Sequence, residues 1–225
     1  MKSFAQYPSK KYIADLRGFK EEKGYRCLST FNYEAYQNEH RNPFGTLLVV
    51  NDEYLAPLHK ISYFFEADLT IILIPLVGAI DFNSANAKGF VHIQQIQLLH
   101  VKKNETLTFE NPYGNEWINF LQIRVNENLS NAILNFDYNP INSLQTVYST
   151  PEIIISTGMF DSKAEQEYVL QNNNNGLFAM TLNGAFEAEF RLLENRDALC
   201  IWDFKKIEME SLTHNGIILL LEIKL

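Results

Sequence analysis

Residues 69–82 read LTIILIPLVGAIDF, and this stretch decides the fold class. An apolar run of strand length ends at Gly78, and an alternating strand begins after that turn. Residues 180–190, MTLNGAFEAEF, have the same form of apolar run, Gly-Ala pair and alternating strand. The repeated form indicates two similar β domains in one chain.

Strand patterns continue along most of the remaining chain. They occur in TLLVVN (46–51), FVHIQQIQLL (90–99), EWINFLQIRV (116–125), EIIIS (152–156), EYVLQ (167–171), GLFAMTL (176–182), AFEAEFRLL (185–193), ALCIWDF (198–204), KIEMES (206–211) and GIILLLEIKL (216–225). Frequent turn signals separate them, and helical signal is confined to a short segment at residues 33–39. Pro75 predicts an edge or a bulge in its strand, because proline cannot donate a ladder hydrogen bond. We therefore predict an all-β fold of two β-barrel domains, joined within the polar segment 135–150.

Composition and charge exclude several classes of protein. The chain has 225 residues and a formal net charge of -8, and its Lys and Arg residues form no cluster. Since phosphate binding needs such clusters, we expect no direct contact with nucleic acid. No run has the length of a membrane helix, and the first residues lack the apolar core of a signal peptide, so we expect a cytoplasmic protein with no membrane contact. Two cysteines, Cys27 and Cys200, do not make a disulfide framework.

Several blocks resemble pirin-like proteins, and together they cover nearly the whole chain. For the first barrel the blocks are TFNYEAY (30–36), FGTLLVVNDEYLAP (44–57), DLTIILIPLVGAIDF (68–82), IQLL (96–99), FENP (109–112) and INFLQI (118–123). For the second barrel they are FDSKAEQEYVL (160–170), LNGAF (182–186) and DALCIWDF (197–204). The resemblance implies a bicupin, with two cupin (jelly-roll) barrels at residues 1–138 and 139–225.

The resemblance also implies a metal site in the first barrel. Pirin-like proteins typically hold one metal ion there, usually iron, through a His-x-His pair, a third histidine, and a glutamate two residues after it. Some members cleave the flavonol quercetin with dioxygen, and others act as nuclear cofactors of transcription regulators. Imidazole and carboxylate ligands suit such a metal, with coordination positions left open for dioxygen or substrate.

The family's four ligand positions carry other residues in this chain. When the blocks are aligned without gaps, the His-x-His pair falls on Phe64 and Glu66, and the later histidine and glutamate fall on Leu107 and Phe109. Three of the four replacements are apolar, and only Glu66 offers an oxygen donor. We therefore predict that Phe64, Glu66, Leu107 and Phe109 line the N-terminal barrel as the remnant of a metal site, without a metal or other cofactor.

A rearranged metal site remains an alternative. It would combine Glu66 with His59 and His100, two histidines that lie outside the family's ligand positions. Glu66 is otherwise expected to reach solvent or to pair with a nearby donor such as His59, Lys60 or His100, because an unpaired buried carboxylate is costly. In the second barrel, Glu187 and Glu189 are expected on one solvated strand face.

The sequence therefore favours a pirin-like bicupin without catalytic activity, which binds a small molecule or a protein partner. It contains no nucleophile elbow, P-loop, Cys-x-x-Cys pair or dinucleotide fingerprint. The alternative is a metal-dependent dioxygenase of the quercetin 2,3-dioxygenase type that uses a rearranged site. A purely structural scaffold is a third interpretation, and the identity of the ligand or partner and the oligomeric state stay open.

Overall fold

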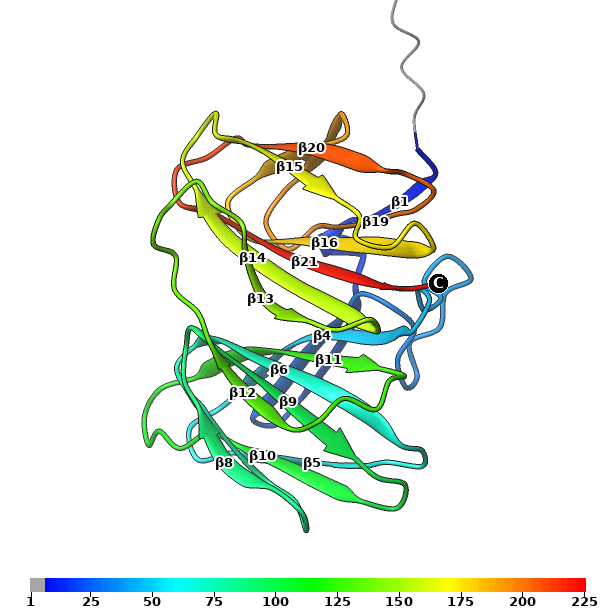
Figure 1. Ribbon diagram of the computed structural model, residues 1–225. Helices are drawn as coiled ribbons and strands as arrows, with labels where there is room; N and C mark the ends of the chain where they lie inside the picture. Colours follow the sequence, from blue (N-terminus) through cyan, green and yellow to red (C-terminus); the bar gives the residue numbers. More distant parts are fainter. Residues whose placement is uncertain (1–6) are drawn as a thin grey trace, which may run out of the picture. The chain divides into compact units, whose positions relative to one another are not determined.

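A computed structural model describes residues 7–225 of the chain, and it confirms the all-β fold (Figure 1). The chain forms two compact units. The N-terminal unit is Arg17–Phe136, and the C-terminal unit combines the described residues up to Leu16 with Asp137–Leu225. Each unit consists of a large and a small antiparallel sheet that face each other as a jelly roll. Within residues 7–225, no helix has the length and hydropathy that crossing a membrane requires.

The N-terminal unit contains a seven-stranded and a four-stranded sheet. In spatial order, the large sheet comprises β12 (Ala132–Asn135), β9 (Gln95–Val101), β6 (Leu69–Val77), β11 (Ile118–Val125), β4 (Leu47–Leu55), β3 (Tyr25–Ser29) and β2 (Gly18–Glu22). The small sheet comprises β5 (Lys60–Phe64), β10 (Thr106–Glu110), β7 (Ile80–Asn83) and β8 (Lys88–Val91).

The C-terminal unit contains a six-stranded and a four-stranded sheet. The large sheet comprises β1 (Ser9–Tyr12), β19 (Ala198–Ile201), β16 (Asn175–Asn183), β21 (Gly216–Lys224), β14 (Ile153–Phe160) and β13 (Gln145–Ser149). The small sheet comprises β15 (Glu165–Val169), β20 (Lys206–Ser211), β17 (Phe186–Ala188) and β18 (Arg191–Leu193). The short 3-10 helix η1 (Ala14–Leu16) follows β1.

The first described strand pairs within the C-terminal unit. β1 lies antiparallel to β19, with Ser9 opposite Ile201 and Tyr12 opposite Ala198. Asp197 holds the segment in place, because its carboxylate accepts a hydrogen bond from the Ala14 backbone N–H at 2.7 Å. The predicted division assigned residues 1–138 to the first barrel, whereas the described residues up to Leu16 make their contacts in the second unit.

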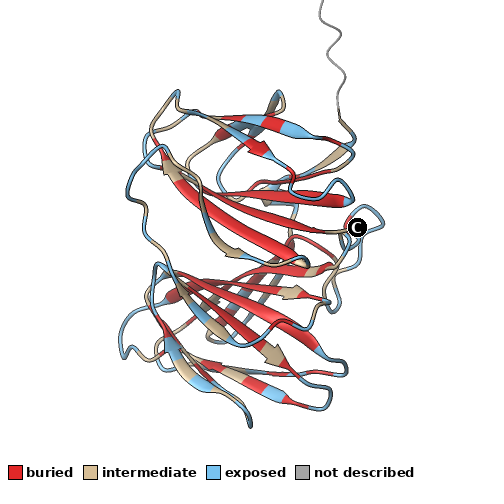
Figure 2. Cartoon of the chain, viewed as in Figure 1, coloured by how far each residue is buried: buried red, intermediate tan, exposed pale blue. Residues whose placement is uncertain are grey.

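Buried residues follow the central strands of each large sheet (Figure 2). β6 is buried from Leu69 to Pro75, as its apolar run predicts for a strand with neighbours on both sides. The predicted bulge is present, since the register between β11 and β6 shifts where Phe120 lies opposite Pro75. β6 is not an edge strand, so the bulge is what accommodates the missing N–H of Pro75.

Glycine ends the apolar strand in both units. Gly78 follows β6 and Gly184 follows β16, with backbone φ angles of 74° and 76°. A Cβ atom on Gly78 would lie 2.8 Å from Ile118 Cγ2, and one on Gly184 would collide with Thr213 Oγ1. Both turns therefore require glycine for its conformation and for its small size.

Three predicted elements differ from the structure. Residues 90–99 end β8 and begin β9 with a turn between them, in which Gln94 has a φ of 61°. Residues 185–193 form the hairpin β17–β18, whose turn residues Glu189 and Phe190 also have positive φ. Apolar alternation continues through both tight turns, so it hides them. Residues 33–39 form turns closed by a bridge between Tyr33 and Tyr36, and no helix.

Candidate site inside the N-terminal unit

The four predicted site residues do not all lie inside the N-terminal unit. Leu107 and Phe109, on β10, are fully buried in its core. Phe64, at the end of β5, has 60% of its surface exposed, and Glu66 lies exposed in the turn that follows. The prediction that Phe64 and Glu66 line the interior is therefore wrong, whereas Leu107 and Phe109 lie where it placed them.

Strand register explains the error in β5. Leu107 lies opposite Tyr63, and Phe64 lies opposite Thr106. Since neighbouring side chains on a strand point to opposite faces, Tyr63 and Phe65 point inward when Phe64 points outward. The gapless alignment therefore places its first two ligand positions one residue away from the inward-pointing Tyr63 and Phe65.

Aromatic packing fills the space between the small and large sheets. The ring of Phe109 makes edge contacts with Tyr63 and Phe120, at centroid distances of 5.8 and 5.7 Å. The inward positions are thus Ile61 and Tyr63 on β5, Phe65 directly after it, and Leu107 and Phe109 on β10, none of which is an imidazole or a carboxylate. This set does not fit the metal that the family resemblance implies.

The rearranged metal site also lacks support from the described residues. Between residues 7 and 225, no three His, Cys, Asp or Glu side chains form a group that could hold a metal ion. The alternative set of His59, Glu66 and His100 is therefore not brought together. Glu66 faces solvent instead, which is one of the two outcomes predicted for it.

A buried carboxyl group lies beside the aromatic packing. Glu53, on β4, is fully buried, and its Oε2 accepts a hydrogen bond from the Tyr63 hydroxyl at 2.7 Å. Asn51 Nδ2 donates to Oε1 at 3.3 Å, and the hydroxyl groups of Tyr63 and Tyr25 lie 3.0 Å apart. Burial raises the pKa of Glu53 to about 7, although the hydrogen bond from Tyr63 opposes this shift. We call these four residues the Glu53 network.

Sequence reasoning missed this network. The only signal was the block NDE at residues 51–53, where three consecutive polar residues interrupt an otherwise apolar strand. Asn51 and Glu53 both point inward from β4, on the same face as Leu55. Polar residues in a strand normally indicate contact with solvent, and only the covering small sheet makes the position of Glu53 an interior one.

Arg124, on β11, lies in a cage of aromatic rings next to the Glu53 network. Its guanidinium carbon is 5.2 Å from the ring centroid of Tyr33 and 5.0 Å from those of Tyr63 and Phe65. Arg124 Nη2 donates to the Tyr33 hydroxyl at 3.1 Å, and Arg124 Nε donates to Gln122 Oε1 at 2.6 Å. The cage holds a half-buried positive charge inside the N-terminal unit.

The C-terminal unit also contains a buried carboxylate, but its partners satisfy it. Glu222 accepts hydrogen bonds from the Tyr168 hydroxyl at 2.8 Å and from Asn175 Nδ2 at 2.9 Å, and also from the backbone N–H groups of Gln171 and Asn172. This arrangement ties the end of β15 to β21. Its saturated hydrogen bonding indicates a structural role.

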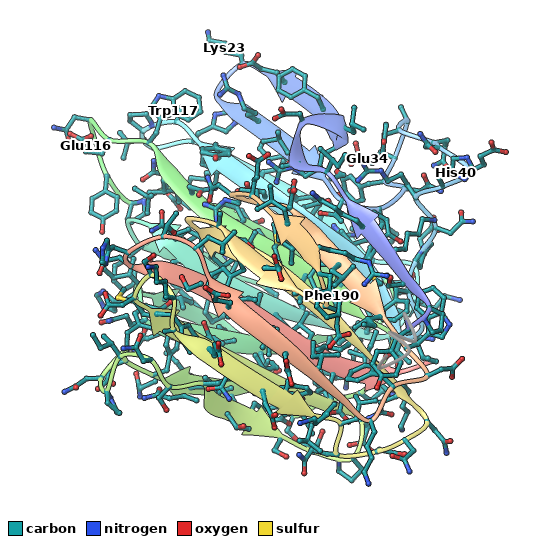
Figure 3. The ribbon with its side chains drawn as sticks, turned by 90° about the horizontal axis from the view of Figure 1, so that it is seen from above. Lys23, Glu34, His40, Glu116, Trp117 and Phe190 are labelled. Atoms are coloured by element: carbon teal, nitrogen blue, oxygen red, sulfur yellow. The ribbon has the colours of Figure 1, made fainter. Side chains whose placement is uncertain are left out.

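The outer face of the small sheet in the C-terminal unit is acidic. A hollow of about 350 Å³ there is bordered by Phe190, which Figure 3 labels, and by six glutamates: Glu165, Glu167, Glu187, Glu189, Glu208 and Glu210. Glu187 is exposed as predicted. Glu189 instead lies in the hairpin turn, and its Oε1 accepts a hydrogen bond from the Glu208 backbone N–H.

Comparison with known proteins agrees with this architecture. Residues 150–223 match the family model of the quercetinase C-terminal cupin domain. No curated protein sequence matches the chain.

Solved structures share the fold across both units. The bacterial pirin YhhW from Escherichia coli, solved in complex with nickel(II), superposes with a TM-score of 0.84 at 15% identity, over 96% of this chain and 99% of that one. YhaK from Escherichia coli gives a TM-score of 0.73 at 15% identity, over 87% and 92% of the two chains. Quercetin 2,3-dioxygenase from Acinetobacter baumannii gives 0.70 at 11% identity, over 99% and 81%.

The predicted resemblance to pirin-like proteins is thus confirmed from two directions, the sequence of the C-terminal cupin and the fold of the whole chain. Residues 150–223 match the quercetinase C-terminal cupin domain, and the chain as a whole has the bicupin fold of the solved pirin structures.

Proposed function

We propose that this bicupin acts as a binding protein that works without the family's metal ion. The observation that carries the proposal is a set of four buried inward side chains at the end of β5 and on β10: Tyr63, Phe65, Leu107 and Phe109. Apolar and phenolic side chains that pack against one another offer a divalent ion neither the imidazole nor the carboxylate ligands it prefers.

Burial of these side chains also replaces the structural contribution of a metal. Burying a large apolar side chain stabilises a fold by about 1.5–3 kcal/mol relative to exposure, and Phe65, Leu107 and Phe109 are all buried. The interior therefore does not need an ion to stay closed. In this proposal the dioxygenase chemistry of the quercetin 2,3-dioxygenase type is absent, and a binding function remains.

We also propose that the protein works in the cytoplasm. Cys27 and Cys200 are both free and buried in the structure. Burial raises the pKa of the Cys27 thiol to about 12, which keeps it protonated and unreactive. Unpaired, protected thiols are the usual state of cysteine in a reducing compartment.

Metal analysis of the purified full-length chain tests the proposal. The protein is incubated in turn with iron, nickel, manganese and copper salts, desalted, and measured by elemental analysis and by quercetin consumption. We expect substoichiometric metal and no quercetin consumption above that of the free ions. One tightly bound equivalent together with quercetin turnover would establish the dioxygenase alternative.

A gain-of-site variant serves as the matched control. Combining Tyr63→His, Phe65→His, Leu107→His and Phe109→Glu restores the family's ligand types at the inward positions. We expect this variant to retain metal after desalting where the natural chain does not, with circular dichroism to check that it folds. Metal retention in the natural chain but not in the variant would contradict the assignment of these four positions.

A further inference from the structure

Four exposed apolar or aromatic side chains lie at one end of the large sheet of the N-terminal unit. They are Leu58, Val77, Tyr113 and Trp117, and each exposes between 37% and 62% of its surface. Single exposed apolar residues are common on proteins, whereas several that meet on one surface indicate an interaction site. We call these four residues the Trp117 patch.

Strand register brings the segments that carry the patch to the same end of the sheet. β11 begins at Ile118, which lies opposite Leu55 at the end of β4. Val77, at the end of β6, lies opposite Asn119 on the other side of β11. The segment after β4, the end of β6 and the segment before β11 are therefore neighbours.

Direct contacts join these segments. The Leu58 backbone N–H donates to the Tyr113 carbonyl oxygen at 3.0 Å. A Cβ atom on Gly78 would lie 3.1 Å from Tyr113 Cε2 and 2.8 Å from Ile118 Cγ2. The tyrosine ring thus lies against the turn that follows β6, and Trp117 directly precedes Ile118 in the chain, so the patch is continuous.

A fully buried asparagine fixes the conformation of this end of the sheet. Asn111 Nδ2 donates to the carbonyl oxygens of Ala56 and Glu116, at 3.0 and 2.7 Å. Its Oδ1 accepts from the Tyr113 backbone N–H at 2.9 Å. One side chain therefore ties the segment after β4 to both ends of the loop at residues 113–116. A surface that is ordered in advance loses less conformational entropy on association.

Two unpaired charges of opposite sign flank the patch. Lys23 is in the turn between β2 and β3, and Glu116 adjoins Trp117 in the chain; neither exposed side chain has an ion pair or hydrogen bond within residues 7–225. The β2–β3 turn reaches this end of the sheet, because the Gly24 carbonyl oxygen accepts from the Ala56 N–H at 2.9 Å. In the view of Figure 3, Trp117 lies between Lys23 and Glu116.

We propose that the Trp117 patch binds the same patch of a second copy of this chain, in a dimer with two-fold symmetry. A two-fold interface is self-complementary, because two different residues that meet across it do so twice. The symmetry axis passes through the apolar patch, and Lys23 of each copy lies against Glu116 of the other. This arrangement pairs both free charges and covers the tryptophan.

Charge complementarity favours a second copy over a strongly acidic or basic partner. Such a partner would attract one of the two flanking charges and repel the other, whereas a second copy presents both signs in the matching order. The net charge of -8 opposes self-association at long range, and four side chains make a small interface. We therefore expect a weak dimer that forms at high protein concentration.

Sedimentation equilibrium of the purified full-length chain, from about 1 to 500 µM, tests the proposal, with a monomer expected at the lowest concentration and a dimer at the highest. Trp117→Ala removes the central aromatic side chain and should weaken dimerisation about tenfold or more. Phe64→Ala is the matched control, because Phe64 is an exposed aromatic residue of the same unit outside the patch. It should dimerise like the natural chain.

Charge reversal tests the symmetry of the interface. Lys23→Glu brings like charges together at two points of the dimer, and so does Glu116→Lys, so each should weaken dimerisation about tenfold. The double variant again has opposite charges at both points and the natural net charge of -8, so it should dimerise like the natural chain. A mixture of the two single variants should form the mixed dimer, because each copy then supplies the charge that the other lacks.

Lys88→Glu controls for the change in net charge. Lys88 is exposed and lies opposite Asn83, at the end of the β7–β8 hairpin away from Gly78. This variant should dimerise like the natural chain.

Three results would overturn the proposal: a monomer at every concentration, unchanged dimerisation of folded Trp117→Ala, or no recovery of dimerisation in the double charge variant. Circular dichroism checks the folding of each variant. If Trp117→Ala does not fold, the charge variants decide alone, because both change exposed side chains. The dimer does not depend on the metal-free function proposed above, so either can fail while the other stands.

Discussion

Glu53 is a polar residue in the mostly apolar interior of the N-terminal unit. Its carboxyl group is fully buried, yet it is tied to Tyr63 and Asn51 by hydrogen bonds. These bonds offset only part of the desolvation of the charged form, since burial still raises the pKa of Glu53 to about 7. Near neutral pH the Glu53 carboxyl is therefore partly protonated, whereas a carboxylate that binds a metal is ionised.

The raised pKa predicts a specific dependence of stability on pH. In the unfolded chain the Glu53 carboxyl has the ordinary pKa of 4.5, and in the folded chain about 7. The unfolded state therefore loses its proton first as pH rises, so this group destabilises the fold progressively between about pH 4.5 and 7. The full effect corresponds to about 3 kcal/mol, at roughly 1.4 kcal/mol for each pKa unit.

Glu53→Gln should remove that dependence. Because glutamine does not ionise, the free energy of unfolding of the variant relative to the natural chain should rise by about 3 kcal/mol from pH 4.5 to pH 8. Urea denaturation across this range measures it. Glu66→Gln, at an exposed carboxyl, should change stability by less than about 0.5 kcal/mol at either pH. A constant difference between Glu53→Gln and the natural chain would refute the raised pKa.

At the scale of the element, β5 shows what alternation in a sequence can and cannot decide. The stretch KISYFF at residues 60–65 contains two interleaved sets of side chains, and each set has a phenylalanine. Alternation predicts that the sets point to opposite faces, but it does not say which face is the interior. The interior set is identified by the pairing of Tyr63 with Leu107 on β10, a contact between residues far apart in the chain.

Among the other elements, some were predicted from the sequence and some were missed. The long apolar strands β4, β6, β11, β14, β16 and β21 were all predicted, because central strands are apolar for most of their length. The hairpin turns inside residues 90–99 and 185–193 were missed, because Gln94, Glu189 and Phe190 adopt positive φ without a glycine to signal it. The Glu53 network and the Arg124 cage were missed because their partners come together only when the two sheets face each other.

The register of β5 predicts opposite outcomes for two adjacent phenylalanines. Phe65 is 2% exposed and Phe64 is 60% exposed. Phe65→Ala should lower the free energy of unfolding by about 3–5 kcal/mol, because it opens a cavity in the core. Phe64→Ala should cost less than about 1 kcal/mol. Urea denaturation of the two variants measures the difference, and the reverse order would restore the gapless alignment.

At the scale of the whole molecule, the first described residues of the chain belong to the C-terminal unit and not to the N-terminal unit. The described amino-terminal segment supplies β1 to the large sheet of the C-terminal unit, where it covers the edge of β19. Lys11 adds an ion pair to Asp197 at 2.9 Å. An edge strand covered in this way is protected from pairing with another chain. The family resemblance assigned this segment to the first barrel. A local sequence pattern does not determine with which distant strand a segment pairs, so the pairing with β19 could not be predicted.

This arrangement predicts where the loss of a β1 side chain will be felt. Tyr12 is 3% exposed and lies opposite Ala198. Tyr12→Ala should destabilise the C-terminal unit by about 3 kcal/mol, as large-to-small changes at buried aromatic positions do. Hydrogen exchange followed by mass spectrometry should then show faster exchange in peptides from β19 and β16. Peptides from β4 and β11, in the N-terminal unit, should keep their natural rates.

Ile13→Ala is the control, because Ile13 is 43% exposed and follows the last residue of β1. It should leave both sets of peptides unchanged. Faster exchange in β4 with no change in β19 would mean that the amino-terminal segment belongs to the first barrel after all, as its position in the chain implies.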